Sequence, residues 1–353
     1  MRPVARLIDA NLNRAREALR VMEDAARFGL DHPALAADLK AARHALAAAA
    51  DQLNHANLIA ARDTPGDLGT AITAAGEYDR ASLADVAAAS AKRLTEALRA
   101  IEEAAKTQAD TQPAAAPVEA LRYRAYDLER RLAMAFRDRS SARWRCCLLL
   151  TQAACARPWR DVLAAALDGG VDCVQVREKQ TTPRDLTAHT RAVIDLARPR
   201  GVAVIVNDRA DVALAAGADG VHLGDDDTPA DQLRAAIGDR LLIGVSTHRL
   251  EEAHAALDAG ADYCGVGQTF PSDTKQRDEL AGLDYVRDYF AWSRQSGIPG
   301  LAIGGITPDN IADVSQAGAT GVAVSRAITT AADPAQAAAA IVQALPPTAD
   351  HPQ

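Results

Sequence analysis

The sequence predicts an α/β protein in which a (β/α)8 TIM barrel follows an all-α helical domain. Three observations support this prediction. Apolar residues follow helical spacing through about the first 135 residues. From Arg145 onward, short apolar runs alternate with helix-compatible segments. There are eight such runs in about 200 residues, which fits a compact barrel of βα units. We place the domains at residues 1–140 and 141–347.

The helical domain carries an internal repeat. Residues 13–27 return as residues 92–106 with eight of 15 positions identical. Apolar residues such as Leu19 and Met22 recur at helical spacing. Pro and Gly punctuate the loop at 62–70, a second break falls at 112–117, and a last helix is expected at about 118–137. The repeat therefore indicates a duplicated helical unit and a helical bundle.

The barrel domain contains eight predicted strands. Each is a nearly continuous apolar run, as expected of parallel strands that are buried on both faces. An open doubly wound sheet is the alternative, but it would normally show a GxGxxG turn after the first strand. Here that turn, residues 151–155, has the sequence Thr-Gln-Ala-Ala-Cys. The predicted strands are Cys146–Thr151, Cys173–Arg177, Ala203–Asp208, Gly220–Gly224, Leu242–Ser246, Tyr263–Gly267, Gly300–Gly304 and Gly321–Ser325.

Composition argues against several classes of partner. The net charge is −8, there is no Lys/Arg run, and aromatic residues make up 4% of the chain, so nucleic acid is not expected as a partner. No apolar stretch predicts a transmembrane helix, and the N-terminus shows no secretory signal. The five cysteines are odd in number and lack metal-type spacing, which predicts reduced thiols in a cytoplasmic protein. We expect small-molecule substrates and leave a homo-oligomer open.

Polar residues cluster where the predicted strands end, which is where barrel active sites form. In the segment 173–179, alternation directs Gln175, Arg177 and Lys179 to one side. A guanidinium and an ammonium group together suit a polyphosphate. A solvated charge cluster is the alternative interpretation.

Carboxylates follow the next two strands. Asp208 and Asp227 are the predicted ligand pair for Mg2+, which takes one or two protein carboxylates together with phosphate and water oxygens. Helix capping is the alternative for Asp225 and Asp226. His222 lies inside a predicted strand and is expected to be a structural residue of the barrel interior.

The remaining strand ends predict further anion contacts. Ser246 is placed to donate to a phosphate or leaving group, although a helix cap is an equal alternative. The loop at 267–275 is rich in hydroxyls and resembles an anion-gripping lid. Gly305, Ser325 and Arg326 form a predicted phosphate cup made of backbone N–H groups. Without a Ser-His-Asp or Cys-His arrangement, two anion ends favour displacement of pyrophosphate over hydrolysis.

These segments, in this order, resemble the thiamine phosphate synthase family. The matching pieces are residues 175–179, 206–209, 217–224 with Asp227, 244–246, 270–275, 303–305 and 321–324. The resemblance implies that hydroxymethylpyrimidine pyrophosphate and a (carboxy)thiazole phosphate condense to thiamine phosphate through a pyrimidine methylene cation.

The resemblance also implies residue roles. Mg2+ on Asp208 and Asp227 would hold the pyrophosphate. The implied catalytic residues are Arg177, Ser246 and Lys275. The implied substrate-binding residues are Gln175, Val176, Arg177, Glu178, Lys179, Asn207, Ser246, Ser272, Asp273, Thr274, Lys275, Gly305, Ser325 and Arg326. The sequence departs from the family pattern at Asp225, where Gln is common, and at Arg326, where Ser is usual.

The helical half resembles the domain often fused before this synthase, which is associated with hydroxymethylpyrimidine phosphate kinase activity. The resemblance rests on residues 6–11, 16–20, 63–70 and 92–99. There is no GxxxxGK[ST] loop, and solvated ion pairs on helix faces are an alternative interpretation of the charge pattern. For the whole chain, a thiazole tautomerase and a non-enzymatic phosphate-binding barrel are the competing hypotheses.

Overall fold

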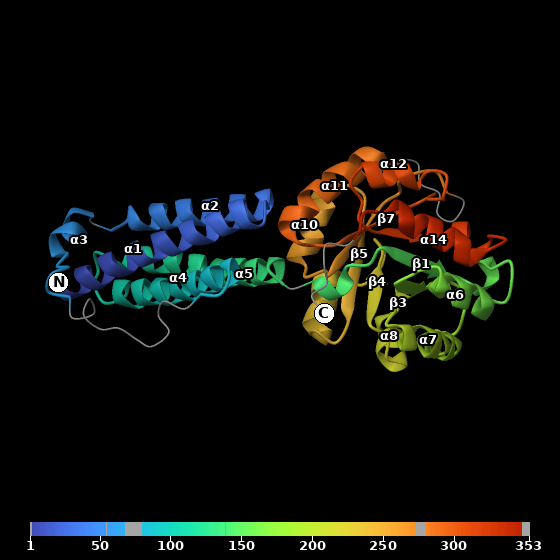
Figure 1. Cartoon of the computed structure of the whole chain (residues 1–353). Helices are drawn as coiled ribbons and strands as arrows, with labels where there is room; N and C mark the ends of the chain where they lie inside the picture. Colours follow the sequence, from blue (N-terminus) through green and yellow to red (C-terminus); the bar gives the residue numbers. More distant parts are fainter. Residues whose placement is uncertain (1, 54, 68–79, 138, 273–279, 348–353) are drawn as a thin grey trace. The chain divides into compact units, whose positions relative to one another are not determined.

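The computed structural model describes residues 2–53, 55–67, 80–137, 139–272 and 280–347. The chain forms two compact units, Met1–Phe136 and Arg137–Gln353. The first unit is built from helices and the second is an α/β barrel (Figure 1). No helix in the described ranges is long and apolar enough to cross a membrane.

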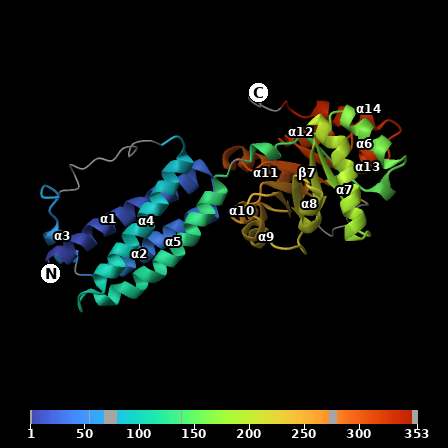
Figure 2. The same cartoon turned by 90° about the horizontal axis from the view of Figure 1, so that it is seen from below.

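Four long helices form the first unit: α1 (Arg2–Asp24), α2 (Pro33–Ala50), α4 (Leu83–Ala105) and α5 (Ala115–Ala135). Helix α1 packs against α2 and α4, and α5 packs against the same two helices, so the four close a bundle (Figures 1 and 2). The apolar stripe that the sequence predicted is buried at its centre, including Leu19, Met22 and Leu98. Shorter elements complete this unit: the π-helix η1 (Ala25–Gly29), α3 (His55–Ala61) and the 3-10 helix η3 (Gln112–Ala114).

The internal repeat extends into a repeated ion pair. Arg43 Nε donates to Glu23 Oε2 at 3.0 Å, and Arg122 Nε donates to Glu102 Oε2 at 2.8 Å. The partners in the second pair lie 79 residues after those in the first. Because Arg43 and Arg122 lie on α2 and α5, the duplicated unit is a helix pair, longer than the 15-residue sequence repeat.

The second unit is a closed barrel of parallel strands, β1 to β8 in chain order, which confirms the predicted TIM barrel and excludes an open sheet (Figure 1). Pairing of β1 with β8 closes it. The strands are β1 (Cys146–Leu150), β2 (Cys173–Val176), β3 (Ala203–Asn207), β4 (Gly220–Leu223), β5 (Leu242–Thr247), β6 (Tyr263–Gly267), β7 (Gly300–Ile303) and β8 (Val322–Val324).

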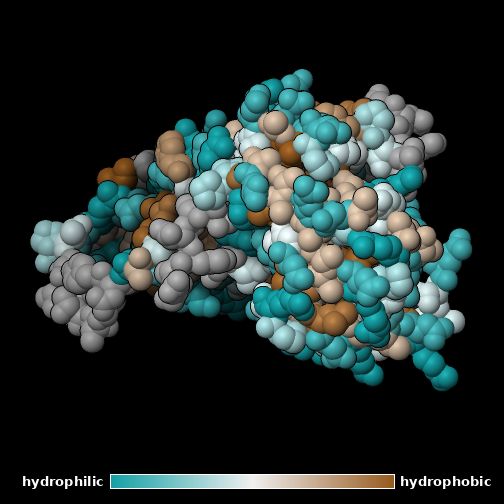
Figure 3. All heavy atoms as spheres, turned by 45° about the vertical axis from the view of Figure 1, so that its right-hand side comes forward, coloured by the Kyte–Doolittle hydropathy of each residue, from teal (hydrophilic) through white to brown (hydrophobic). Residues whose placement is uncertain are grey.

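Helices surround the strands, and hydrophilic side chains are spread over the outer face seen in Figure 3. The helices are α6 (Trp159–Asp168), α7 (Pro183–Ala197), α8 (Ala210–Ala216), α9 (Ala230–Ile237), α10 (Leu250–Asp258), α11 (Gly282–Ser296), α12 (Ile311–Gln316), α13 (Arg326–Thr329) and α14 (Pro334–Ala344). Short 3-10 turns are η4 (Ser140–Ala142), η5 (Gln152–Ala154) and η6 (Arg198–Arg200).

A repeated Gly-X-Asp segment fixes the N-terminal ends of the strands. It occurs at 170–172, 217–219 and 260–262, directly before β2, β4 and β6. Each glycine has a positive φ, of 93°, 78° and 83°, which favours glycine because it lacks a Cβ. Each aspartate carboxylate accepts a backbone N–H at the start of the neighbouring strand β1, β3 or β5, at 2.9, 2.7 and 2.8 Å. This end of the barrel is therefore structural, and the opposite end is free to carry the loops of a site.

Apolar side chains from alternate strand positions fill the barrel interior. The core cluster includes Leu149, Ile205, Tyr263 and Leu301, with Trp144 beneath them. Polar residues take over at the next inward positions toward the C-terminal strand ends. These positions form the floor of a cavity.

Candidate active site

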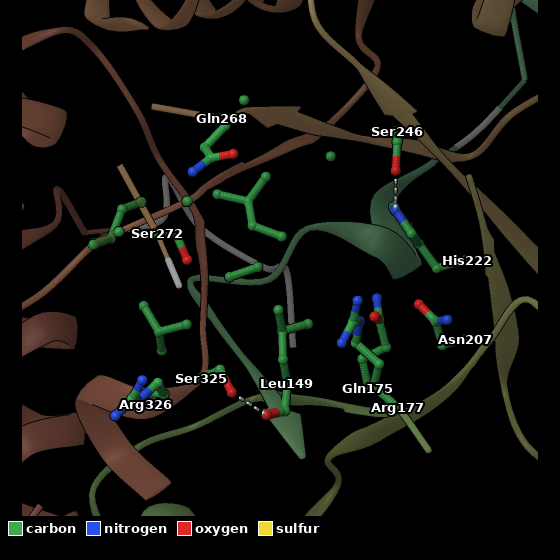
Figure 4. Close-up of a pocket in the computed structure, with 18 of the residues that line it drawn as sticks. Leu149, Gln175, Arg177, Asn207, His222, Ser246, Gln268, Ser272, Ser325 and Arg326 are labelled. Carbon is green, nitrogen blue, oxygen red and sulfur yellow. Dashed lines mark hydrogen bonds between the residues drawn. The ribbon is translucent and has the colours of Figure 1, made fainter. Parts of the chain in front are cut away.

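A cavity of about 870 Å³ opens at the C-terminal ends of the barrel strands, where the sequence placed the site (Figure 4). Gln175, Arg177, Asn207 and Ser246 lie on one side of the close-up, and Ser325 and Arg326 lie on the other. The predicted residues that line the cavity are Gln175, Arg177, Lys179, Asn207, Asp208, Ser246, Ser272, Gly305, Ser325 and Arg326. Asp273, Thr274 and Lys275 lie outside the described residues.

The end of β2 separates its charged residues between two directions. Arg177 and Lys179 line the cavity together with Gln175, whose side chain is buried beneath them. Glu178 instead accepts the backbone N–H of Gln152 at 2.6 Å and lies 3.7 Å from His189 Nε2. The cavity therefore receives the two cations, while the intervening carboxylate braces the neighbouring β1 loop.

Val176 also lies away from the cavity lining. Its side chain is fully buried in β2 at the position between Gln175 and Arg177. Alternation along a strand places successive side chains on opposite faces, so neither Val176 nor Glu178 faces the same way as Arg177. Both were included as substrate-binding residues on the strength of the family motif alone.

Asp208 and Asp227 come together beside the two cations. Burial and the neighbouring Asp227 carboxylate together raise the pKa of Asp208 to about 6, against the lowering effect of the Lys179 and Arg177 charges. Asp227 Oδ2 accepts the backbone N–H of Gly224 at 2.7 Å, which orients it. Asp208 itself has a φ of +62°, an uncommon conformation for a residue other than glycine.

Two neighbouring carboxylates repel each other unless a proton or a cation lies between them. The pair is thus chemically suited to a divalent cation bound by oxygen. Within the described ranges, no group of three or more His, Cys, Asp or Glu side chains is arranged to hold a metal. A cation at Asp208 and Asp227 would therefore need further oxygens from substrate or water.

A hydrogen-bonded row runs from Ser246 into the barrel. His222 Nε2 lies 3.1 Å from Ser246 Oγ, and His222 Nδ1 lies 3.1 Å from the Tyr263 hydroxyl oxygen. The side chain of Gln175 lies beside Tyr263. His222 is largely buried and itself lines the cavity beside Ser246.

The far side of the cavity is formed mainly by backbone. Gly304 and Gly305 have φ of 105° and 62°, and a Cβ at Gly305 would lie 2.4 Å from the carbonyl oxygen of Pro271. Only glycine therefore lets the two loops meet so closely. Ser325 Oγ donates to the carbonyl oxygen of Leu149 at 3.0 Å, so its hydroxyl is used within the protein while Arg326 reaches the lining.

Comparisons with known proteins identify the family of the chain. A family model described as thiamine monophosphate synthase matches residues 146–328. A thiamine-phosphate synthase of Rhodopirellula baltica is 40% identical over 334 residues, which cover 93% of this chain and 88% of the relative. The chain belongs to the thiamine-phosphate synthase family. It is a transferase of thiamine biosynthesis that forms thiamine phosphate, as the sequence predicted.

Other relatives extend the comparison. A thiamine-phosphate synthase of Nostoc punctiforme is 41% identical, over 94% of this chain and 91% of its own length. A solved thiamine phosphate pyrophosphorylase of Pyrococcus furiosus is 33% identical with a TM-score of 0.52, and covers 58% of this chain and 96% of its own. A second family model, described as the ThiD2 family, matches residues 6–131 of the helical unit. The curated synthases therefore match both units, whereas the solved one covers a length close to that of the barrel unit alone.

The structure adds lining residues of the synthase that sequence reasoning missed. His248 and Gln268 line the cavity, and His248 Nε2 lies 3.7 Å from Asp225 Oδ2. The position of His248, two residues after Ser246 and just past β5, was the signal that could have identified it. Asp225, the departure from the family pattern, thus lies beside a histidine in this synthase.

Proposed function

We propose that the synthase binds its two substrates at opposite sides of the 870 Å³ cavity and joins them there. The pyrimidine pyrophosphate would bind beside Arg177, Lys179 and the carboxylate pair. The thiazole phosphate would bind beside Gly305 and Arg326. One observation carries the proposal: cationic side chains line one part of a single cavity, and glycine backbone with an arginine lines another.

The reaction then proceeds by loss of pyrophosphate. The bond between the pyrimidine methylene carbon and the pyrophosphate oxygen breaks, and its electron pair leaves with pyrophosphate. The thiazole nitrogen donates its lone pair to the resulting methylene cation to form the new C–N bond. Arg177, Lys179 and Lys275 neutralise the charge that develops on the leaving group, and Ser246 donates a hydrogen bond to it.

The other cavity residues orient the substrates. Gln175 and Asn207 contact the pyrimidine, and Ser272, Thr274 and Gly305 hold the thiazole phosphate. Holding both reactants in one cavity converts a bimolecular encounter into a step with aligned reacting atoms.

Mg2+ is the proposed cation at Asp208 and Asp227. The raised pKa of Asp208 beside Asp227 supports the assignment, since a bound cation would relieve the repulsion between the two carboxylates. When bound there, Mg2+ would supply positive charge that favours departure of pyrophosphate.

The test is formation of thiamine phosphate from both phosphorylated substrates in the presence of Mg2+. Asp208→Asn should abolish Mg2+-dependent turnover while circular dichroism shows an intact fold. Asp226→Asn, an equal charge change at an exposed neighbour, is the matched control and should retain activity. Absence of product from the folded wild-type chain would refute the synthase proposal, and full activity in Asp208→Asn would refute the metal site.

We also propose that the helical unit phosphorylates hydroxymethylpyrimidine phosphate to the pyrophosphate that the barrel consumes. The ThiD2 match supports a separate role for this unit. A polar cluster gives it a candidate site: Arg62 makes two hydrogen bonds to the buried Asp9, at 2.7 and 2.8 Å, and Arg6 reaches the carbonyl oxygen of Asp63 at 2.9 Å.

The experiment supplies the full chain with pyrimidine monophosphate, ATP and Mg2+, and measures ADP and pyrimidine pyrophosphate. Asp9→Asn should lower the rate of this step without changing condensation when pyrimidine pyrophosphate is given directly. Absence of ATP-dependent conversion by the wild-type chain would refute the kinase role and leave the synthase role unaffected.

A cytoplasmic location is also part of the proposed function, and it accords with the five free thiols of the chain.

A further inference from the structure

Tyr263 lies below the cavity, yet its hydroxyl connects two of the residues that line it. The side chain is 1% exposed and packs edge-on against Trp144 at 5.1 Å between ring centroids. Its hydroxyl oxygen lies 3.1 Å from His222 Nδ1, and the Gln175 side chain lies beside it. Through His222 it also reaches Ser246, because His222 Nε2 is 3.1 Å from Ser246 Oγ.

The barrel is built to receive this ring. A Cβ at Gly244, on the neighbouring strand β5, would lie only 2.1 Å from Tyr263 Cζ. A Cβ at Gly265 would lie 3.1 Å from His222 Cε1. Two glycines on adjacent strands thus make room for the tyrosine and histidine rings and hold them in contact. Substitution of either glycine would displace the row of hydrogen bonds.

We propose that Tyr263 is a positioning residue of the synthase, which sets the direction of the hydrogen bonds that Gln175 and Ser246 present to the substrates. This inference rests on the proposed binding of pyrimidine pyrophosphate in the cavity. Gln175 and Ser246 face the substrates in this proposal, whereas the Tyr263 hydroxyl that orients them does not.

Counting protons leaves two directions for this row. The Tyr263 hydroxyl has one proton to donate, and its oxygen lies 3.1 Å from His222 Nδ1 with the Gln175 side chain beside it. Where the Gln175 amide N–H donates to this oxygen, the tyrosine donates its proton to His222 Nδ1. His222 then carries its proton on Nε2 and donates it to Ser246 Oγ. Ser246 is left with its own O–H for the cavity, and Gln175 is left with its carbonyl oxygen.

The opposite direction gives a site of the wrong polarity. Tyr263 would donate to Gln175, His222 would carry its proton on Nδ1, and Ser246 would donate back to His222 Nε2. Ser246 would then face the cavity with lone pairs, which repel the oxygens of a leaving pyrophosphate. Gln175 would present N–H groups to an aminopyrimidine that itself carries N–H donors. The first direction is the one that suits both substrate groups.

The direct test is the protonation state of one histidine. In protein labelled with 15N at its eight histidines, the couplings between ring nitrogens and carbon-bound protons distinguish the two neutral forms. His222→Gln identifies the resonance that belongs to His222. We expect the wild-type chain, without substrate, to hold His222 with its proton on Nε2. A proton on Nδ1 would overturn the proposal, whatever the activity of the protein.

The kinetic test uses Tyr263→Phe, which keeps the ring and removes the hydroxyl. We expect kcat to fall about tenfold and KM for the pyrimidine pyrophosphate to rise, with KM for the thiazole phosphate unchanged. Tyr285→Phe is the matched control: its buried hydroxyl donates to Thr247 Oγ1 at 2.7 Å, away from the cavity lining. It should leave kcat and both KM values unchanged.

The outcomes separate this inference from the proposed function. A wild-type chain that forms no thiamine phosphate refutes the function, while the histidine measurement still decides the direction of the hydrogen bonds. An active wild-type chain with unchanged kinetics in Tyr263→Phe refutes the positioning role alone. An equal rise in both KM values would also refute it, because general loosening of the barrel affects both sides of the cavity. If Tyr263→Phe does not fold, the wild-type histidine spectrum remains decisive.

Discussion

Glu102 is a carboxylate with no exposed side-chain surface, held in the helical unit by three cations. Arg122 lies at 2.8 Å, Lys106 at 2.7 Å and Arg99 at 2.9 Å. Burial by itself raises its pKa, but the hydrogen bonds from Lys106 and Arg122 outweigh burial and lower the pKa from 4.5 to about 2. Glu102→Gln removes the charge while keeping the shape of the side chain.

The size of the effect follows from that pKa. A change from 4.5 to about 2 corresponds to about 3 kcal/mol of preference for the charged form. The Arg99 and Lys106 side chains are 54% and 45% exposed, so solvent screens their share. Arg122 is 8% exposed and would keep a largely buried charge whose remaining carboxylate partner, Glu119, lies at 3.9 Å. We therefore expect Glu102→Gln to lower the free energy of unfolding of the helical unit by about 2 to 3 kcal/mol.

The same pair predicts a pH dependence. Because the pKa of Glu102 is lower in the folded state, its contribution is complete above pH 4.5 and is lost as the pH falls toward about 2. In that interval the unfolded chain binds more protons, so stability falls as the pH decreases. The Gln variant should lack this part of the pH dependence. The difference in stability between wild type and variant should therefore shrink on acidification.

The distribution of tryptophan makes the assay specific to one unit. Trp144, Trp159 and Trp292 are the three tryptophans of the chain, and all lie in the barrel unit. Urea unfolding followed by tryptophan fluorescence therefore reports the barrel, whereas far-ultraviolet circular dichroism reports both units. Glu102→Gln should move the midpoint of the helical transition and leave the fluorescence midpoint in place.

Glu103→Gln is the matched control for this measurement. It removes the same charge one position along α4, but its side chain is 52% exposed and its pairs with Arg99 and Lys106 lie in solvent. Its effect should stay below about 0.5 kcal/mol. Equal destabilisation by the two variants would show that total charge matters rather than the buried pair. A wild-type value for Glu102→Gln would show that the buried pair adds nothing to stability.

Three further changes test the barrel. Gly305→Ala places a Cβ 2.4 Å from a backbone oxygen at a residue with a φ of 62°. KM for the thiazole phosphate should therefore rise about tenfold or more. An unchanged KM would contradict the assignment of Gly305 to the phosphate site. Arg234→Met removes a buried guanidinium that donates to Asp262, and should lower the free energy of unfolding of the barrel by about 3 kcal/mol in the fluorescence assay. An unchanged fluorescence midpoint would contradict a stabilising role for this ion pair. Glu178→Ala leaves the Gln152 N–H without its acceptor and should raise KM for the pyrimidine pyrophosphate about fivefold. Glu178→Gln keeps an acceptor oxygen and should have the wild-type KM. An equal rise in KM in both variants would show that the charge of Glu178 matters rather than its hydrogen bond.

The strands were predictable because strands buried on both faces produce a recognisable apolar pattern in the sequence. A parallel strand buried on both faces is a continuous apolar run, and all eight predicted strands match the observed ones within one residue at each end. The last strand is one residue shorter than predicted at both ends: β8 begins at Val322 and ends at Val324. Its flanking residue Ser325 instead turns into α13 and bonds across to β1.

The cavity side chains of β2 were predictable for a different reason. The pleat alone directs Gln175, Arg177 and Lys179 to one side, and all three line the cavity. The family motif spans the same residues but adds Val176 and Glu178, which the structure places elsewhere. Strand geometry therefore separated the cavity residues of this segment, which the motif treats as one block.

Tyr263 could not be identified in this way. In the sequence it is one apolar residue at the start of a strand, and its role depends on Gly244 and His222 on other strands. Which residues of different strands contact each other can be predicted only when the register of the closed barrel is known. The same holds for Glu23 and Arg43, whose pairing depends on how α1 and α2 pack.

The arrangement at β2 also resolves how a chain with a net charge of −8 can handle two phosphorylated substrates. Overall charge acts at long range and is screened within about 10 Å at ordinary salt. Binding depends instead on the charges inside the cavity, where Arg177 and Lys179 face inward while the carboxylate of Glu178 is turned toward Gln152 and His189. The acidic residues that do lie beside these cations are Asp208 and Asp227, and their mutual repulsion favours a bound cation over an empty site. An acidic protein thus presents cationic side chains to this cavity because the pleat of β2 turns Arg177 and Lys179 into it.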